Sequence, residues 1–235
     1  MHYGLRLRGR GCRPDGYGRC YTYFDMGVRP LALALWMAAS IFAAEQDDIT
    51  YRTLVQRVKS GDFSIDFRAL RVACIKSSQC EPRSTADDLS VLNQAMADHR
   101  FQAAADLAER LIDEGFANME VHADCVAIYK GLNHLEKSQF HLNVVTGMLG
   151  SIMASGDGRT KETAFEVTYT REEWITLSAK GLPYVGSGIV GVSQVTDGPH
   201  RYSRWEVLSP KTGQTVVVWF QTDLVSRVKD GAHRK

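Results

Sequence analysis

The chain has 235 residues, enough for one large domain or two small ones, and its 44% hydrophobic and 23% charged content excludes wholesale disorder. The net charge of +1 hides an asymmetry: residues 1–44 hold six of the 28 Lys and Arg residues and two of the 27 Asp and Glu residues, so 22 basic and 25 acidic residues follow. That balance excludes a strong electrostatic footprint for nucleic acid after Ala44.

Residues 1–44 form a predicted leader. Arg29 precedes the uncharged apolar run Leu31–Phe42, which is too short to span the roughly 30 Å of a bilayer core. This order predicts a signal peptide over residues 26–44, cleaved near Ala43 or Ala44, and therefore export to the periplasm or the exterior. A buried N-terminal helix or an uncleaved anchor is the alternative. Residues 1–25 lack periodicity and fit translated upstream sequence, with Met26 as the true start.

Three cysteines follow the leader, and they match neither a C-x-x-C motif nor Cys/His zinc spacing. In an exported protein Cys74 and Cys80 could form a local disulfide. The alternative is that these two and Cys125 are reduced, half-buried thiols.

Residues 45–155 are predicted to be helical. Apolar residues recur at helical spacing over residues 47–59, 66–76, 86–97, 101–114, 119–130 and 134–154. Two of these helices begin near Phe101 and Leu135, an offset of 34 residues that is typical of tetratricopeptide repeats. We therefore expect antiparallel helical hairpins of this kind, which form either a peptide-binding groove or a plain helical core. Two apolar faces are expected to point inward: Ile49, Leu54, Val55 and Val58 in the first helix, and Leu135, Leu142, Val145, Met148, Leu149 and Ile152 in the last.

Residues 156–228 form a predicted β-rich region packed on the helices, and residues 229–235 a tail. Strand patterns cover residues 164–169, 188–196, 201–208 and 215–222, and Asp197-Gly198 is a hairpin turn signal. A short helix is expected after Thr170. The sequence thus predicts an α+β fold that ends in a small, mostly antiparallel sheet with one short helix.

Known catalytic motifs give no assignment. Residues 186–191 match G-x-G-x-x-G, but a strand pattern follows where a dinucleotide site needs a helix, so glycines in a turn or bulge are favoured. The histidines are scattered along the chain. His122, beside Glu120 and Asp124, is interpreted as part of a solvated face. The tryptophans Trp174, Trp205 and Trp219 are expected in the core. We assign no catalytic, cofactor-binding or metal-binding residue and expect no cofactor.

The most distinctive stretch is Met148–Val167, where helical patterns give way to strand patterns. We name Ser155–Phe165 the signature loop. Gly156 and Gly158 are expected to take positive φ and close the preceding helix, and Asp157 to hydrogen-bond its own turn. The alternative is that Asp157 and Glu162 bind a cation or a polar ligand. The candidate residues are Ser155, Gly156, Asp157, Gly158, Thr160, Glu162, Thr163 and Phe165.

This stretch resembles the signature of a bacterial family catalogued as domain of unknown function 4919. Its members end a helix in a similar S-G-D-G and then open a strand with T-x-E-T-A and an aromatic residue. The likeness extends roughly from Tyr51 to Val225, and Cys74 and Cys80 stand where the family tends to have aromatic residues. The resemblance implies a small exported protein of Gram-negative bacteria and carries no activity with it.

Together these patterns favour a non-enzymatic interaction or accessory module of the bacterial envelope. Its partner would be another envelope protein or a peptide, and no membrane span is expected beyond the leader. The alternative is a hydrolase or a protein that binds a small ligand or metal, with its site at the helix–sheet junction near Asp157 and Glu162.

Overall fold

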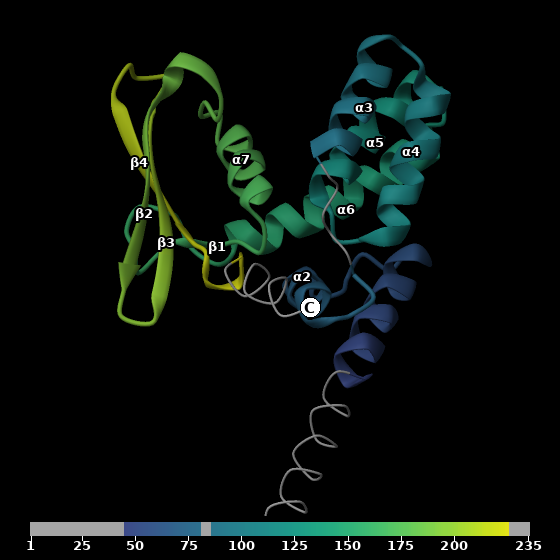
Figure 1. Ribbon diagram of the computed structural model, residues 1–235, viewed down its shortest axis with the longest axis horizontal. Helices are drawn as coiled ribbons and strands as arrows, with labels where there is room; N and C mark the ends of the chain where they lie inside the picture. The colour runs from purple at the N-terminus through teal and green to yellow at the C-terminus, as the bar shows by residue number, and fades with distance from the viewer. Residues whose placement is uncertain (1–44, 81–85, 226–235) are drawn as a thin grey trace, which may run out of the picture. The chain divides into compact units, whose positions relative to one another are not determined.

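The computed structural model describes residues 45–80 and 86–225 (Figure 1), all of which belong to one compact unit, Ala44–Lys235. The predicted leader with its cleavage site and the predicted tail lie outside the described residues. Within the described ranges, no helix is both long and apolar enough to cross a membrane.

The helical region is built as the sequence predicts. Residues 45–59 are helical, and five labelled helices follow: α2 (Phe67–Lys76), α3 (Ala86–Ala97), α4 (Phe101–Glu114), α5 (Met119–Gly131) and α6 (Leu135–Met153). Side-chain caps fix two of the helix starts, because Asp66 accepts a hydrogen bond from Ala69 N (3.0 Å) and Asn118 accepts one from Val121 N (3.3 Å).

The predicted spacing is present, since α4 begins at Phe101 and α6 at Leu135. Successive helices from α3 to α6 contact one another as hairpins. Whether these hairpins are true tetratricopeptide repeats stays a prediction.

The expected inner face of α6 is confirmed at Met148 and Ile152 and is wrong at Leu135 and Leu142. Leu135 and Leu142 are 63% and 42% exposed, and the buried stripe is His141, Val144, Met148 and Ile152. Apolar residues lie on two neighbouring stripes of this helix. The buried stripe includes His141, which the sequence alone suggests is a polar surface residue. Ile49, also expected inside, is 42% exposed.

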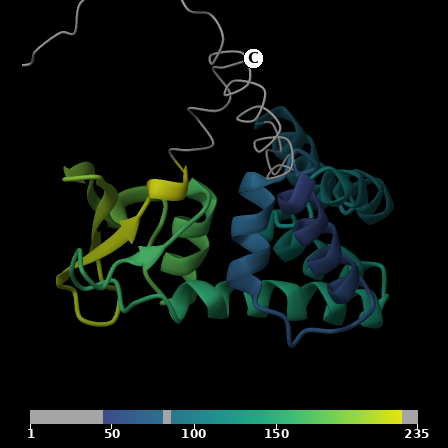
Figure 2. The same cartoon turned by 90° about the horizontal axis from the view of Figure 1, so that it is seen from below.

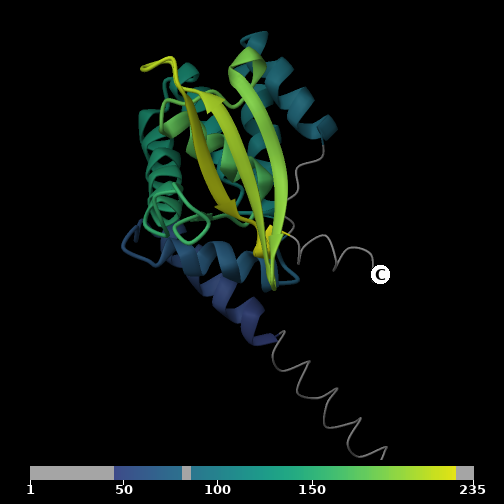
Figure 3. The same ribbon diagram turned by 90° about the vertical axis from the view of Figure 1, so that its left-hand side faces the viewer.

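The β-rich region forms a four-stranded sheet in the order β1-β4-β3-β2 (Figure 3). Its strands are β1 (Phe165–Glu166), β2 (Ile189–Asp197), β3 (His200–Leu208) and β4 (Thr215–Gln221), with α7 (Thr170–Ala179) and the 3-10 turn η1 (Gly186–Gly188) between β1 and β2. β1 pairs with β4 in parallel and the other pairs are antiparallel. This confirms the α+β fold, although the strand expected over residues 164–169 shortens to two residues.

The residues that match G-x-G-x-x-G form a turn and a β-bulge. η1 contains its first glycines, and the register of β2 against β3 shifts between Ile189 and Gly191. Because a strand follows, the segment cannot present a helix N-terminus to phosphate.

Helix α7 lies between the sheet and helices α5 and α6 (Figures 1 and 2). On the sheet side, buried Glu173 accepts hydrogen bonds from Trp205 Nε1 (2.6 Å) and Ser203 Oγ (3.0 Å) of β3. Trp205 is buried as expected, whereas Trp174 and Trp219 are only partly buried. A carboxylate thus fixes the position of α7 on an otherwise apolar sheet face.

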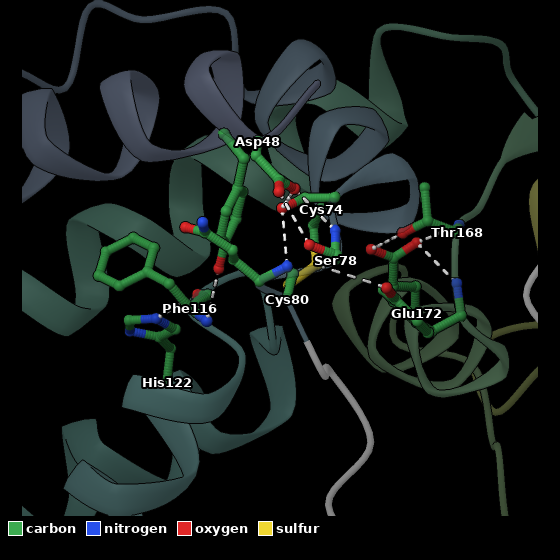
Figure 4. The surroundings of a disulfide bond; sticks show 12 residues. Asp48, Cys74, Ser78, Cys80, Phe116, His122, Thr168 and Glu172 are labelled. Atoms are coloured by element: carbon green, nitrogen blue, oxygen red, sulfur yellow. Dashed lines mark hydrogen bonds between the residues drawn. A yellow bond between two sulfur atoms is a disulfide. The ribbon is translucent and has the colours of Figure 1, made fainter. Parts of the chain in front are cut away.

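A buried ion pair joins the helical region to the β-rich region. Arg71 of α2 donates from Nε and Nη2 to the two carboxylate oxygens of Glu172 of α7, both at 2.9 Å. The same guanidinium also donates to Ser151 Oγ of α6 (3.0 Å) and to the carbonyl oxygen of Glu166 in β1 (2.8 Å). Thr168 completes the carboxylate shell of Glu172 through its N–H (2.6 Å) and its hydroxyl (2.9 Å) (Figure 4).

Cys74 and Cys80 are joined by a disulfide that encloses the end of α2, and Cys125 is free and buried. Asp48 of the helix over residues 45–59 accepts hydrogen bonds from Ser77 Oγ (2.7 Å), Ser78 N (2.8 Å) and Ser78 Oγ (2.8 Å) (Figure 4). These bonds lower the pKa of the Asp48 carboxyl. The closed loop is therefore held against the preceding helix.

We predict that Arg71→Met lowers the free energy of unfolding by about 3–5 kcal/mol, because it leaves the Glu172 carboxylate buried without its cation. The exposed pair of Arg100 and Asp98 offers a control, and Arg100→Met should cost less than about 1 kcal/mol. Urea denaturation followed by circular dichroism measures both changes. Equal effects of the two substitutions would contradict a central role for Arg71.

Candidate functional site

The signature loop is held by hydrogen bonds within its own turn. Asp157 Oδ1 accepts bonds from Arg159 N (2.9 Å) and Thr163 Oγ1 (2.6 Å), and the N–H groups of Asp157 and Gly158 both donate to the Thr163 carbonyl oxygen (3.0 and 2.7 Å). Thr160 and Thr163 each accept a long bond, 3.3 Å, from the other's backbone N–H. The loop is thus a closed turn that leads the chain into β1.

The two glycines of the loop have different roles. Gly158 has φ of +72°, as expected, and a Cβ there would collide with the Phe165 ring. The expectation of positive φ at Gly156 is wrong. A Cβ at Gly156 would lie 2.2 Å from the Thr163 carbonyl oxygen, so this glycine permits close backbone approach instead. Neither closes α6, which ends at Met153 with Ala154 as its cap.

Both ends of the loop are anchored to the sheet. Ser155 Oγ accepts a hydrogen bond from Glu166 N (2.8 Å), and the Gly158 carbonyl oxygen accepts one from Trp219 N (2.8 Å). Phe165 is fully buried, with its ring centroid 5.8 Å from that of Phe220. The loop therefore has a fixed position beside β4.

A pocket of about 480 Å³ opens where the signature loop meets α2, α6, β1 and β4, and we call it the junction pocket. Its charges have both signs, with Arg68 and Lys161 opposite three carboxylates. Hydroxyl and amide groups complete the polar lining. The pocket is lined by Asp66, Arg68, Ser151, Ala154, Ser155, Lys161, Glu162, Ala164, Glu166 and Gln221.

Glu166 has the least satisfied polar atom of this pocket. Its Oε2 accepts a hydrogen bond from Arg68 Nη2 (2.7 Å). Its Oε1 is buried and has no hydrogen-bond partner within the described part of the chain. A buried acceptor without a partner costs about 1–3 kcal/mol, and a donor group on a ligand would recover this free energy once the Glu166 side chain turns Oε1 into the pocket.

The acids singled out in the sequence are surface acceptors. Hydrogen bonds from Thr163 and Arg159 N lower the pKa of Asp157, and hydrogen bonds from its own backbone N–H and from Thr160 lower the pKa of Glu162. Glu162 lines the junction pocket, whereas Asp157 lies beside a different hollow with Gly158 and Lys180. Across residues 45–80 and 86–225, no three His, Cys, Asp or Glu side chains are grouped to hold a metal ion.

An ion pair extends the loop across the sheet. Lys161 Nζ pairs with Asp197 at the turn between β2 and β3, which raises the pKa of Lys161 and lowers that of Asp197. Lys161 also lines the junction pocket. One lysine of the loop therefore reaches both the pocket and the far hairpin.

Sequence reasoning missed the residues that α2 and β1 add to this site. Asp66 and Arg68 come from a segment with no motif, and Glu166 lies in the distinctive stretch Met148–Val167 without being one of the candidate residues. Only the chain's path brings the three together. Glu166 lies one residue beyond the signature loop, which is the nearest available signal.

The interpretation of His122 as part of a solvated face is wrong. Its ring is fully buried, with Nε2 at 2.8 Å from the Phe116 carbonyl oxygen and Nδ1 at 2.9 Å from Nδ1 of His141. α5 contacts α4, α6 and α7, so little of its surface is left for solvent. The spacing of His122, Cys125 and Tyr129, one helical face, was the signal in the sequence.

A family model described as Domain of unknown function (DUF4919) matches residues 42–190, more than half of the chain. The chain belongs to this family. The match includes the signature loop and the helices that surround the junction pocket. It ends at Val190, whereas the resemblance had been expected to continue to Val225. No curated protein and no solved structure matches the chain.

We predict that Asp157→Ala lowers the melting temperature by several degrees, because Arg159 N and Thr163 Oγ1 lose their acceptor. Asp157→Asn keeps an amide oxygen at that position and should retain most of the stability. Thermal unfolding by circular dichroism measures both. An Asp157→Ala protein as stable as the wild type would shift weight from a structural role to ligand binding.

The histidine pair predicts a pH dependence of stability. Burial lowers the pKa of His122 to about 3 and that of His141 to about 4, from an ordinary value of 6.5. Below pH 6.5 the unfolded chain binds more protons at these rings than the folded chain. The stability that depends on the neutral rings is complete above pH 6.5 and is lost as the pH falls toward 4.

Because of this pair, we expect the free energy of unfolding to fall by about 2 kcal/mol per histidine when the pH is lowered from 7.5 to 5. Asp124 acts in the opposite sense, because burial raises its pKa to about 7 and its protonation favours the folded state as the pH falls. The double variant His122→Gln, His141→Asn keeps Asp124 and isolates the pair. Urea midpoints at pH 7.5 and pH 5 measure the change in stability for the wild type and for the double variant. An equal change in the two proteins would contradict the prediction.

Proposed function

We propose that this protein is an exported, non-enzymatic accessory module of the bacterial envelope that binds a polar peptide segment of a partner protein in the junction pocket. The observation that carries the proposal is the buried Oε1 of Glu166, an acceptor with no partner in the described residues. A backbone N–H of a peptide is a donor that satisfies such an acceptor.

The lining of the pocket supports a peptide as its occupant. Arg68 and Lys161 supply donors for peptide carbonyl or carboxylate oxygens, and the Ser151 and Ser155 hydroxyls can donate or accept. A volume of about 480 Å³ is within the usual range of binding pockets. The mixed charge favours a polar segment over an apolar one.

The ionisation of the exposed acids favours a binding role over acid–base catalysis. A general acid or base works best with a pKa near the operating pH. The pKa values of Asp157 and Glu162 are lowered by hydrogen bonds, so both groups stay ionised as acceptors.

Export is supported by the leader pattern of residues 26–44 and by the disulfide between Cys74 and Cys80. Disulfides persist in oxidising compartments and are rare in reducing ones. In the periplasm or outside the cell this bond would keep the loop after α2 closed beside Asp48.

The test is site-specific photocrosslinking of the full chain produced in a Gram-negative host. The photoreactive residue p-benzoylphenylalanine replaces Glu162 at the pocket in one protein and Val91 of α3, which is 59% exposed, in the control. We expect the Glu162 position alone to capture a defined envelope protein, and Glu166→Ala to weaken that capture severalfold. The recovered chain should begin near Ala44 or Glu45.

Three results would overturn the proposal. Retention of the intact leader in the cytoplasmic fraction would remove export. Equal crosslinking from the two positions, or capture that Glu166→Ala leaves unchanged, would remove the junction pocket as the binding site. Tight binding of a small polar molecule that protects Glu162 from crosslinking would favour a small-ligand site there instead.

A further inference from the structure

The helical region contains a second pocket, separate from the junction pocket, which ends on a buried histidine. It has a volume of about 340 Å³ and lies among α4, α5 and α6. His141 of α6 lines it, and this ring is hydrogen-bonded to His122, which in turn contacts the Phe116 carbonyl oxygen. Figure 4 shows the Phe116 and His122 end of this chain of contacts. We call the cavity the histidine pocket.

The geometry of these contacts determines where the protons lie. A carbonyl oxygen can only accept, so His122 must carry its proton on Nε2 and donate to Phe116. A neutral His122 then has a lone pair on Nδ1, and His141 must donate to it from its own Nδ1. His141 therefore has no proton on Nε2.

The unprotonated Nε2 of His141 is open to a ligand. It lies on the ring edge away from the Nδ1 bond to His122, and no described residue donates to it. His141 lines the pocket with 7% of its surface exposed, and its Nε2 is not among the buried polar atoms without a partner in the described residues. The histidine pocket thus holds a positioned hydrogen-bond acceptor.

Aromatic and aliphatic groups form the walls around this acceptor. The Tyr129 ring is stacked on His141, with centroids 5.3 Å apart and planes 7° apart. The Phe140 ring stands edge-on to His141 at 5.2 Å and 87°, and Ile112 adds an aliphatic surface. Such walls suit a flat apolar body.

The charges at the pocket compensate one another. Lys137 Nζ donates to Glu109 Oε1 (3.0 Å), which also accepts from the Tyr129 hydroxyl. Lys59 Nζ lies 3.4 Å from Asp113 Oδ1. Each carboxylate has its own lysine, so the site has no net charge to attract an ionic ligand.

We propose that the histidine pocket binds small, neutral aromatic molecules that carry one O–H or N–H donor, and that the donor bonds to Nε2 of His141. The His141 acceptor favours a ligand with a hydrogen-bond donor, and the stacked and edge-on rings favour a flat ligand. The paired charges favour a ligand without net charge. Phenol is the simplest probe of this class. Anisole has the same ring and oxygen but no donor.

Nitrogen-detected NMR of the full chain with ¹⁵N-labelled histidine tests the proposal at pH 7.5. We expect His141 Nε2 to resonate as an unprotonated nitrogen and to shift on titration with phenol. Anisole should bind about tenfold more weakly, the equivalent of one net hydrogen bond. His141→Asn keeps an amide donor toward His122 but removes the pocket acceptor, so it should abolish the preference for phenol.

His134→Asn is the matched control, because His134 stacks on Tyr129 (6.3 Å) without lining the pocket, and it should leave phenol binding unchanged. A protonated Nε2 on His141, equal affinities for phenol and anisole, or no binding of phenol would each overturn the proposal. The wild-type titrations decide this even if His141→Asn fails to fold.

Discussion

The buried pair of Arg71 and Glu172 is the constraint on which the rest of the structure depends. A guanidinium and a carboxylate that are withdrawn from water destabilise a fold unless their hydrogen bonds are satisfied. Here the guanidinium reaches α6, α7 and β1 at once, and the carboxylate accepts further bonds from Thr168. Since these bonds have strict directions, they fix α2 against the start of the sheet, where apolar contacts alone would permit sliding.

The same principle recurs in the interior on both sides of this pair. Glu173 positions α7 on β3 through Ser203 and Trp205, and the histidine pair positions α5 on α6. Each is a buried polar group with directed partners, and each lies at a contact between two elements of the fold. The core of this protein is therefore specified by polar contacts within an apolar surround.

Both binding surfaces that we propose follow from the same arrangement. In the junction pocket, Arg68 uses one oxygen of Glu166 and leaves the other without a partner. In the histidine pocket, His122 uses one nitrogen of His141 and leaves the other unprotonated. In each case a structural hydrogen bond orients a side chain and determines which of its atoms remains available to a ligand.

The sequence by itself determined the elements, because local periodicity, caps and turn signals act over a few residues. It placed the helices from α2 to α6 and the long strands, and it gave the signature loop of the family with its Asp157 turn. It could not pair Arg71 with Glu172 or His122 with His141, since a buried polar residue has the same letter as a solvated one. Only the tertiary structure decided those partners, because burial and hydrogen-bond direction depend on segments up to about a hundred residues apart, as Arg71 and Glu172 are.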